Sequence, residues 1–271
     1  MNKTVKILYA ALFIFFAAVF IVSAIVVVDY AMETKRQNDH YGDLAASVHA
    51  ARTDPTEPDV TEPEGTAGTD ETEPTVEPEP TILPEYAGLY EMNADLVGWL
   101  TVPGTKIDYP VTQTPDSKDY YLKRNFSKEE STGGCLYVRE QCDVFEPSDN
   151  LTIYGHNMKI GTMFHDLRKY KKQSFWESHQ TFTFDTLYEH HTYQIIAVFK
   201  TSGTTGKGYP YHQFVDAESE EDFNDFVADI LKLSMYDTGL TAEYGDKLIC
   251  LSTCEYSITN GRLVVVGKRI S

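Results

Sequence analysis

The hydrophobic pattern changes character along the chain. Near the amino terminus, residues 7–28 form an uncharged apolar run that as a helix would be about 33 Å long, enough to cross a hydrocarbon core of about 30 Å. Residues 54–80 carry almost no apolar side chains, whereas 81–271 alternates short apolar runs with turn residues. The pattern therefore predicts a membrane-spanning helix, a polar linker and one folded domain.

The apolar run has two interpretations. Lys3 and Lys6 precede it, as in the basic region of a cleaved signal peptide. However, the run over 7–28 is longer than the usual signal-peptide core of about 7 to 15 residues. We expect an uncleaved transmembrane helix over 7–28 behind a short terminus, 1–6. Basic residues flank the run almost equally on both sides, so the positive-inside rule does not decide its orientation.

Residues 29–80 are expected to form a juxtamembrane segment followed by an acidic linker. The part from 54 to 80 contains ten Asp or Glu, six Pro and no Lys or Arg, and it supplies −10 of the formal charge of −18. Such a segment cannot bury enough apolar surface to offset its ordering entropy, so we expect it to be an extended tether. The overall negative charge argues against a nucleic-acid partner, because a phosphate backbone requires a basic face.

The domain over 81–271 is predicted to be mainly β with helices. Apolar and alternating runs predict six early strands, at 99–102, 107–111, 135–138, 151–154, 181–184 and 192–201. Helical spacing predicts helices over Pro84–Met92, over 163–170 and from a Ser219 cap to about 234. Many short strands with interspersed helices favour a closed β-barrel decorated by helices.

Two further strands form the end of the chain. The runs 248–254 and 262–268 are separated by a polar segment holding Asn260-Gly261, a strong hairpin signal. Antiparallel pairing would set Cys254 beside Arg262, with their backbones roughly 5 Å apart.

Together with His156, which follows the strand 151–154, this pair suggests cysteine acyl transfer. The thiolate of Cys254 would be the nucleophile, and His156 is suited to carry protons near neutral pH. Arg262 remains protonated, so it serves as a fork of donors for an oxyanion or a substrate backbone.

Three neighbours of the cysteine are candidates for contacts with substrate. Ser252 alternates onto the same strand face as Cys254, and Thr253 adjoins it. The backbone N–H of Glu255 follows the nucleophile and is a second candidate oxyanion donor.

Three segments, YGHNM at 154–158, LSTCE at 251–255 and RLVVVGK at 262–268, resemble the sortases, membrane-anchored cysteine transpeptidases of Gram-positive bacteria, and within them class B. The resemblance implies a closed eight-stranded barrel with an N-terminal helix and a helix before the cysteine strand. It implies His156, Cys254 and Arg262 as the catalytic residues. It also implies an amino terminus inside the cell and a single-pass protein whose domain lies outside.

The resemblance further implies a reaction. Sortases cleave a C-terminal sorting motif of a secreted protein after its Thr, hold the product as a thioacyl enzyme, and pass it to an amine. That amine belongs to a peptidoglycan precursor, or to a pilin lysine in polymerising members. A hydrolytic cysteine protease and a non-catalytic, stalked wall-binding module are the alternatives from other classes.

Other candidate groups point to structure. Cys250 is expected in the core, and a disulfide between Cys135 and Cys142 and a reduced pair both stay open. Five further histidines lack the spacing of a zinc motif, so no metal or cofactor is expected. These five are His165, His179, His190, His191 and His212.

Overall fold

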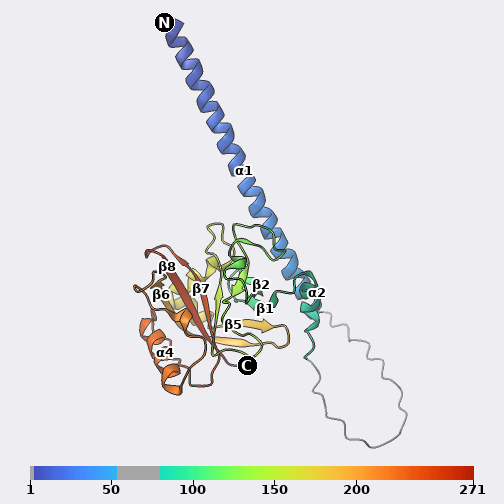
Figure 1. Ribbon diagram of the computed structural model, residues 1–271, viewed down its shortest axis with the longest axis vertical. Coiled ribbons are helices and arrows are strands. Elements are labelled where there is room, and N and C mark those ends of the chain that lie inside the picture. The colour runs from blue at the N-terminus through green and yellow to red at the C-terminus, as the bar shows by residue number, and fades with distance from the viewer. Residues whose placement is uncertain (1–2, 54–79) are drawn as a thin grey trace, which may run out of the picture. The chain divides into compact units, whose positions relative to one another are not determined.

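The computed structural model describes residues 3–53 and 80–271 (Figure 1). The chain divides into two compact units, Met1–Asp43 and Leu44–Ser271, and we call the second the barrel unit. Apart from Pro80, the predicted acidic tether lies outside the described residues.

Helix α1 (Lys3–Thr53) contains the predicted apolar run. Within the described residues, it is the one helix long and apolar enough to cross a membrane. Its large apolar side chains are exposed, with Phe13 at 75% and Phe20 at 73%. Such a surface is costly in water and suits lipid. The segment after the run is also helical, up to Thr53.

Eight strands close into a barrel in the order β1-β2-β3-β4-β7-β8-β6-β5, which confirms the predicted barrel. Their bounds are β1 Leu96–Thr101, β2 Asp108–Thr112, β3 Leu136–Val138, β4 Asn150–Tyr154, β5 Thr181–Thr186, β6 Thr192–Ser202, β7 Leu248–Glu255 and β8 Gly261–Arg269. The pairs β2/β3 and β4/β7 are parallel, and the other neighbours are antiparallel.

The helices agree with the sequence in two places and differ in one. Helix α2 (Pro84–Met92) has the predicted bounds, and α4 (Glu220–Leu233) starts at Ser219, whose side chain accepts a hydrogen bond from the Asp222 backbone. The helix expected over 163–170 is instead a 3₁₀ helix, η2 (Phe164–Lys171). Its buried residues Phe164, Leu167 and Tyr170 repeat every third position, which matches three residues per turn. Three short elements complete the set: η1 Tyr120–Lys123, α3 Gln173–Ser178 and η3 Tyr211–Gln213.

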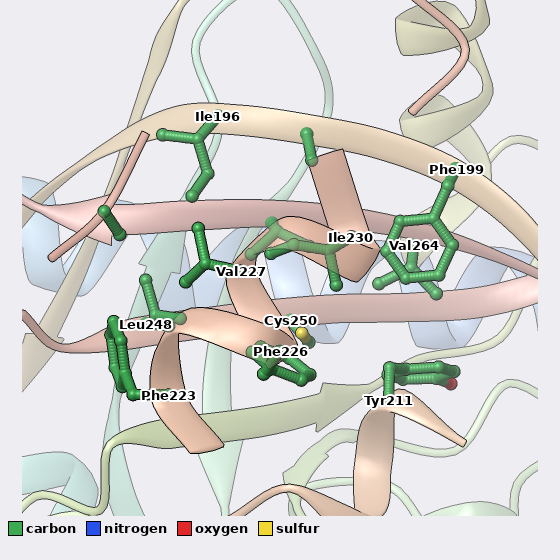
Figure 2. Packing of buried hydrophobic residues seen from close by; sticks show 13 residues of the cluster. Ile196, Phe199, Tyr211, Phe223, Phe226, Val227, Ile230, Leu248, Cys250 and Val264 are labelled. Carbon is green, nitrogen blue, oxygen red and sulfur yellow. The ribbon is translucent and has the colours of Figure 1, made fainter. Parts of the chain in front are cut away.

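Helix α4 covers one face of the strands β6, β8 and β7 (Figure 2). Its apolar side packs Phe223, Val227 and Ile230 against the sheet, where Leu248 and Cys250 come from β7. Successive side chains of a strand alternate between faces, so the same face of β7 continues through residues 252 and 254. The core under α4 therefore fixes which face of β7 carries Cys254.

The last turns of α1 belong to the barrel unit. Val48 is completely buried, and Arg52 enters a corner formed by α2 and β5. The Arg52 guanidinium lies 2.5 Å from the Asp185 carboxylate and 3.4 Å from that of Glu85, and it also donates to the Tyr86 hydroxyl. This corner ties α1, α2 and β5 together.

All four cysteines are reduced thiols, three of them buried. Cys135 and Cys142 have separate partners, the backbone oxygens of Pro110 and Asn150, and no disulfide joins them. Cys250 is fully buried, as expected, and burial raises the pKa of its thiol. Cys254 differs from these three because it is partly exposed.

Candidate active site

Cys254 and Arg262 face each other across the β7/β8 hairpin. The register pairs them directly, as the hairpin signal predicted. The turn depends on the two residues where it enters β8: Asn260 has a φ of +50°, and a Cβ on Gly261 would lie 2.2 Å from the Glu255 carbonyl oxygen. Because side chains of a directly opposed pair share one face, the thiol and the guanidinium lie on the same side of the sheet.

The parallel pairing of β4 and β7 brings His156 to the same place. The last pair of this ladder is Tyr154 with Ser252. His156 and Cys254 each follow that pair by two residues, so they are level with each other. Glycine is needed at position 155, between Tyr154 and His156, because a Cβ there would lie 2.5 Å from the Leu136 side chain and 2.7 Å from that of Phe164. The three residues expected to share one site therefore converge at one strand end.

The His156 ring has a defined orientation. Its Nε2 lies 2.8 Å from the carbonyl oxygen of Leu122. A carbonyl oxygen only accepts, so Nε2 carries the hydrogen in this bond. Nδ1 is then the ring atom left to accept or release a proton. No side chain signals this contact in the sequence, because the partner is a backbone group far away in the chain.

Arg262 is bound only to oxygens of its own turn. Its Nη1 donates to the backbone oxygen of Gly261 at 3.0 Å and to two oxygens of Asn260 at 3.2 and 3.3 Å. Within residues 3–53 and 80–271, no carboxylate lies within 4 Å of its guanidinium. The remaining donors of the fork are thus available to a ligand.

Comparisons with known proteins agree with this geometry. Residues 100–270 match the family model described as the Sortase domain. The chain is 37% identical over 190 residues to sortase B of Listeria monocytogenes serovar 1/2a, covering 69% of this chain and 74% of that protein. The chain belongs to the sortase family.

Solved structures place it within class B. The Staphylococcus aureus sortase B-substrate complex has a TM-score of 0.73 at 27% identity, covering 89% of this chain and 99% of that one. A sortase B structure complexed with triglycine has a TM-score of 0.72 at 26% identity, covering 88% and 99%. The protein is thus a cysteine transpeptidase that sorts proteins to the cell wall, and the wall-binding and hydrolytic alternatives give way to it.

The side chains of Ser252, Thr253 and Glu255 have partners within the sortase itself, whereas the contact predicted for Glu255 is through its backbone N–H. The Ser252 hydroxyl lies 2.6 Å from the hydroxyl of Tyr211, and the Thr253 hydroxyl donates to the Gly155 carbonyl at 2.7 Å. The Glu255 carboxylate is buried and forms an ion pair with Lys171 at 2.9 Å.

Glu255 is held ionised by its neighbours. Burial alone would raise its pKa, but hydrogen bonds from Lys171 and Ser257 outweigh burial and lower the pKa to about 2. The carboxylate therefore stabilises the strand end next to the nucleophile. The roles of Ser252, Thr253 and Glu255 toward substrate stay predictions.

A pocket of about 470 Å³ opens beside Arg262. Tyr154, Tyr211 and Gly203 are among its lining residues, whereas Cys254 and His156 are not. The lining carries charges of both signs, with Lys118 and Arg139 beside Asp119 and Glu140. Burial and the nearby cations, Arg139 first, lower the pKa of His212. The glycine-rich segment after β6 forms one wall of the pocket.

The side chains of the described residues also determine whether the protein could bind a metal ion. Within the part of the chain that the structure describes, no three His, Cys, Asp or Glu side chains group together as a metal site requires.

Proposed function

We propose that this sortase uses Cys254, His156 and Arg262 to cleave a sorting motif after its Thr and to transfer the product to a peptidoglycan amine. The observation that carries the proposal is the register: the β7/β8 and β4/β7 pairings bring all three residues to one strand end.

The first half of the reaction forms the thioester. The Cys254 thiolate attacks the carbonyl carbon of the motif's Thr, and the carbonyl oxygen becomes an oxyanion. Arg262 donates to that oxyanion with the part of its guanidinium that the turn leaves unused. When the tetrahedral intermediate collapses, the C–N bond breaks and the leaving amine takes a proton from His156 Nδ1.

The second half reverses the proton path. The acceptor amine gives its proton to His156 Nδ1 and attacks the thioester carbon, which again produces an oxyanion beside Arg262. Collapse forms the new amide and releases the Cys254 thiolate. The same three groups therefore serve both halves, and no cofactor is needed.

The pocket beside Arg262 is the proposed site of the sorting peptide. Its lining includes the oxyanion donor Arg262, and its walls combine aromatic rings with charged side chains of both signs. A related sortase B was solved as a substrate complex, which supports a peptide site in this fold. Another was solved with triglycine, which supports a glycine-type amine as acceptor. A pilin lysine is the competing acceptor.

The proposed location is the cell membrane. We propose residues 1–6 as cytoplasmic, 7–28 as a single membrane span, 29–80 as juxtamembrane segment and linker, and 81–271 as the catalytic domain outside a Gram-positive cell. The exposed apolar surface of α1 supports the span. The last turns of α1, from Leu44, join the catalytic domain in one compact unit.

The test is a ligation assay with the full chain in detergent micelles. A panel of Thr-containing sorting peptides is mixed with triglycine, a lysine peptide or no acceptor, and products are followed by mass spectrometry. We expect a triglycine-ligated product that Cys254→Ala abolishes and that Cys142→Ala, which removes a buried thiol, retains. Ligation only to the lysine peptide would replace the proposed acceptor, and ligation by Cys254→Ala would contradict the nucleophile.

A further inference from the structure

Three hydrogen bonds tie the His156 loop to the end of β7 after the regular β4/β7 ladder stops. The Gly155 backbone N–H donates to the Ser252 carbonyl at 3.1 Å, and the Thr253 hydroxyl donates to the Gly155 carbonyl at 2.7 Å. The third bond runs from the Asn157 side-chain amide to the Cys254 carbonyl at 2.9 Å. Two of these three bonds use side chains in place of backbone groups.

Asn157 is held from two directions. Its side chain donates to Cys254, and its own carbonyl accepts a hydrogen bond from the Tyr256 hydroxyl at 3.2 Å. Cys254 and Tyr256 therefore each form a hydrogen bond with Asn157, one with its side chain and one with its backbone. Asn157 is 5% exposed, whereas Tyr256 is 71% exposed and contributes little to the core.

The bond to Cys254 has a further consequence for His156. In cysteine proteases of other folds, an Asn or Asp side chain orients the catalytic imidazole. Here the Asn157 amide is committed to the Cys254 backbone, and the imidazole is held instead by the Leu122 carbonyl. Asn157 therefore acts on the distance between the two strand ends and not on the ring.

We propose that Asn157 is a positioning residue that keeps the His156 loop and the Cys254 strand end in one register during transpeptidation. The inference rests on the proposed function, because it assumes that these two residues exchange a proton. Removal of the hydrogen bond from Asn157 to the Cys254 carbonyl lets the His156 loop shift against β7. A shift of about 1 Å between reacting groups is enough to cost on the order of 100-fold in rate.

The experiment compares three variants of the full chain in detergent micelles. Asn157→Ala removes the side chain that bonds to Cys254. Asn157→Asp keeps the shape of the side chain but loses the amide donor, and Tyr256→Phe removes only the hydroxyl. Asn224→Asp and Tyr244→Phe are the matched controls. They make the same chemical changes at exposed positions away from the site.

Two readouts separate positioning from stability. The first is kcat and KM for the peptide of highest yield with triglycine, well below the melting temperature of each variant. The second is the alkylation rate of Cys254 by iodoacetamide, read by mass spectrometry. We expect kcat to fall by about 10- to 100-fold in both Asn157 variants, with KM changed by less than about threefold. Cys254 alkylation near pH 7 should slow as well, and Tyr256→Phe should show a smaller loss in the same direction.

The outcomes remain distinguishable. Wild-type kcat and alkylation in Asn157→Asp and Tyr256→Phe overturn the inference, and so does a loss confined to thermal stability. These two variants decide the question even if Asn157→Ala does not fold. In either case Cys254→Ala tests the proposed function separately: if it remains active, the nucleophile is wrong, whatever Asn157 does.

Discussion

Two arginines of the barrel unit show how the same side chain serves two purposes. Arg52 lies in a corner where its Nη2 donates to Asp185 and to the Tyr86 hydroxyl, and the Glu85 carboxylate lies 3.4 Å from its Nε. Burial opposes its charge, but these partners outweigh burial and raise the pKa of its guanidinium. Among the described residues, Arg262 donates hydrogen bonds only to oxygens of its own turn, and it lines a pocket.

The difference concerns the charge of the groups that each arginine contacts. A guanidinium paired with largely buried carboxylates holds elements together, and removing it takes away a cation that balances their charge. A guanidinium with uncommitted donors is pre-organised for a ligand that arrives later, such as an oxyanion. We therefore expect Arg52 to control stability and Arg262 to control rate.

The strongest test of the comparison is Arg262→Lys. The charge remains, but an ammonium group does not reproduce the planar fork. Loss of an oxyanion donor is expected to lower kcat by about 100- to 1,000-fold. Thermal unfolding should remain close to wild type, because Arg262 holds no carboxylate. Kinetics and melting curves of the same preparation check both parts, and near-normal turnover would remove Arg262 from an oxyanion role.

The mirror-image test is Arg52→Met in a fragment spanning 44–271. Two largely buried carboxylates lose the guanidinium but keep contacts with His190, so we expect about 2 to 3 kcal/mol of destabilisation with kcat within about twofold of wild type. Denaturant unfolding measures the loss, and Arg168→Met, at an exposed position, is the control.

A fragment of 81–271 lacks Arg52 altogether, so it should be destabilised at least as much. Equal stability of the two fragments would show that the Arg52 corner holds nothing together.

The smallest expected effect on stability concerns the Lys171–Glu255 ion pair. It lies next to the nucleophile, yet like the Arg52 corner it joins a cation to a buried carboxylate. The pKa of Glu255 is lowered from 4.5 to about 2. Its ion pair with Lys171 therefore stabilises the fold fully above about pH 4.5, and this stability is lost as the pH falls toward 2. We expect the melting temperature of wild type to fall more steeply over this range than that of Glu255→Gln. Parallel curves would show that the pair contributes no acid-sensitive stability.

Local signals were enough to predict much of the fold. Pro84 at the first turn marked α2, the Ser219 cap marked α4, and Asn260-Gly261 marked the β7/β8 hairpin. Each signal acts within a few residues, so it does not depend on the rest of the chain. The hairpin alone predicted the pairing of Cys254 with Arg262.

Features that depend on contacts between distant segments could not be predicted from the sequence. Phe164, Leu167 and Tyr170 were interpreted as an α-helix, because a spacing of three fits both kinds of helix over so short a run. The parallel pairing of β4 with β7 joins segments about a hundred residues apart, and no turn fixes its register. The sequence therefore offers His156 as a candidate from its place after a strand, but not its alignment with Cys254, and it does not indicate the bond from Asn157 to Cys254.

The most direct test of the account traps the enzyme in mid-reaction. The full chain is incubated with a sorting peptide and no amine acceptor, then quenched in acid and digested, and the peptide containing Cys254 is weighed by mass spectrometry. We expect an added mass equal to the motif up to its Thr, attached at Cys254, which disappears when triglycine is supplied. An adduct on another residue, or ligation to triglycine by Cys254→Ala, would contradict it.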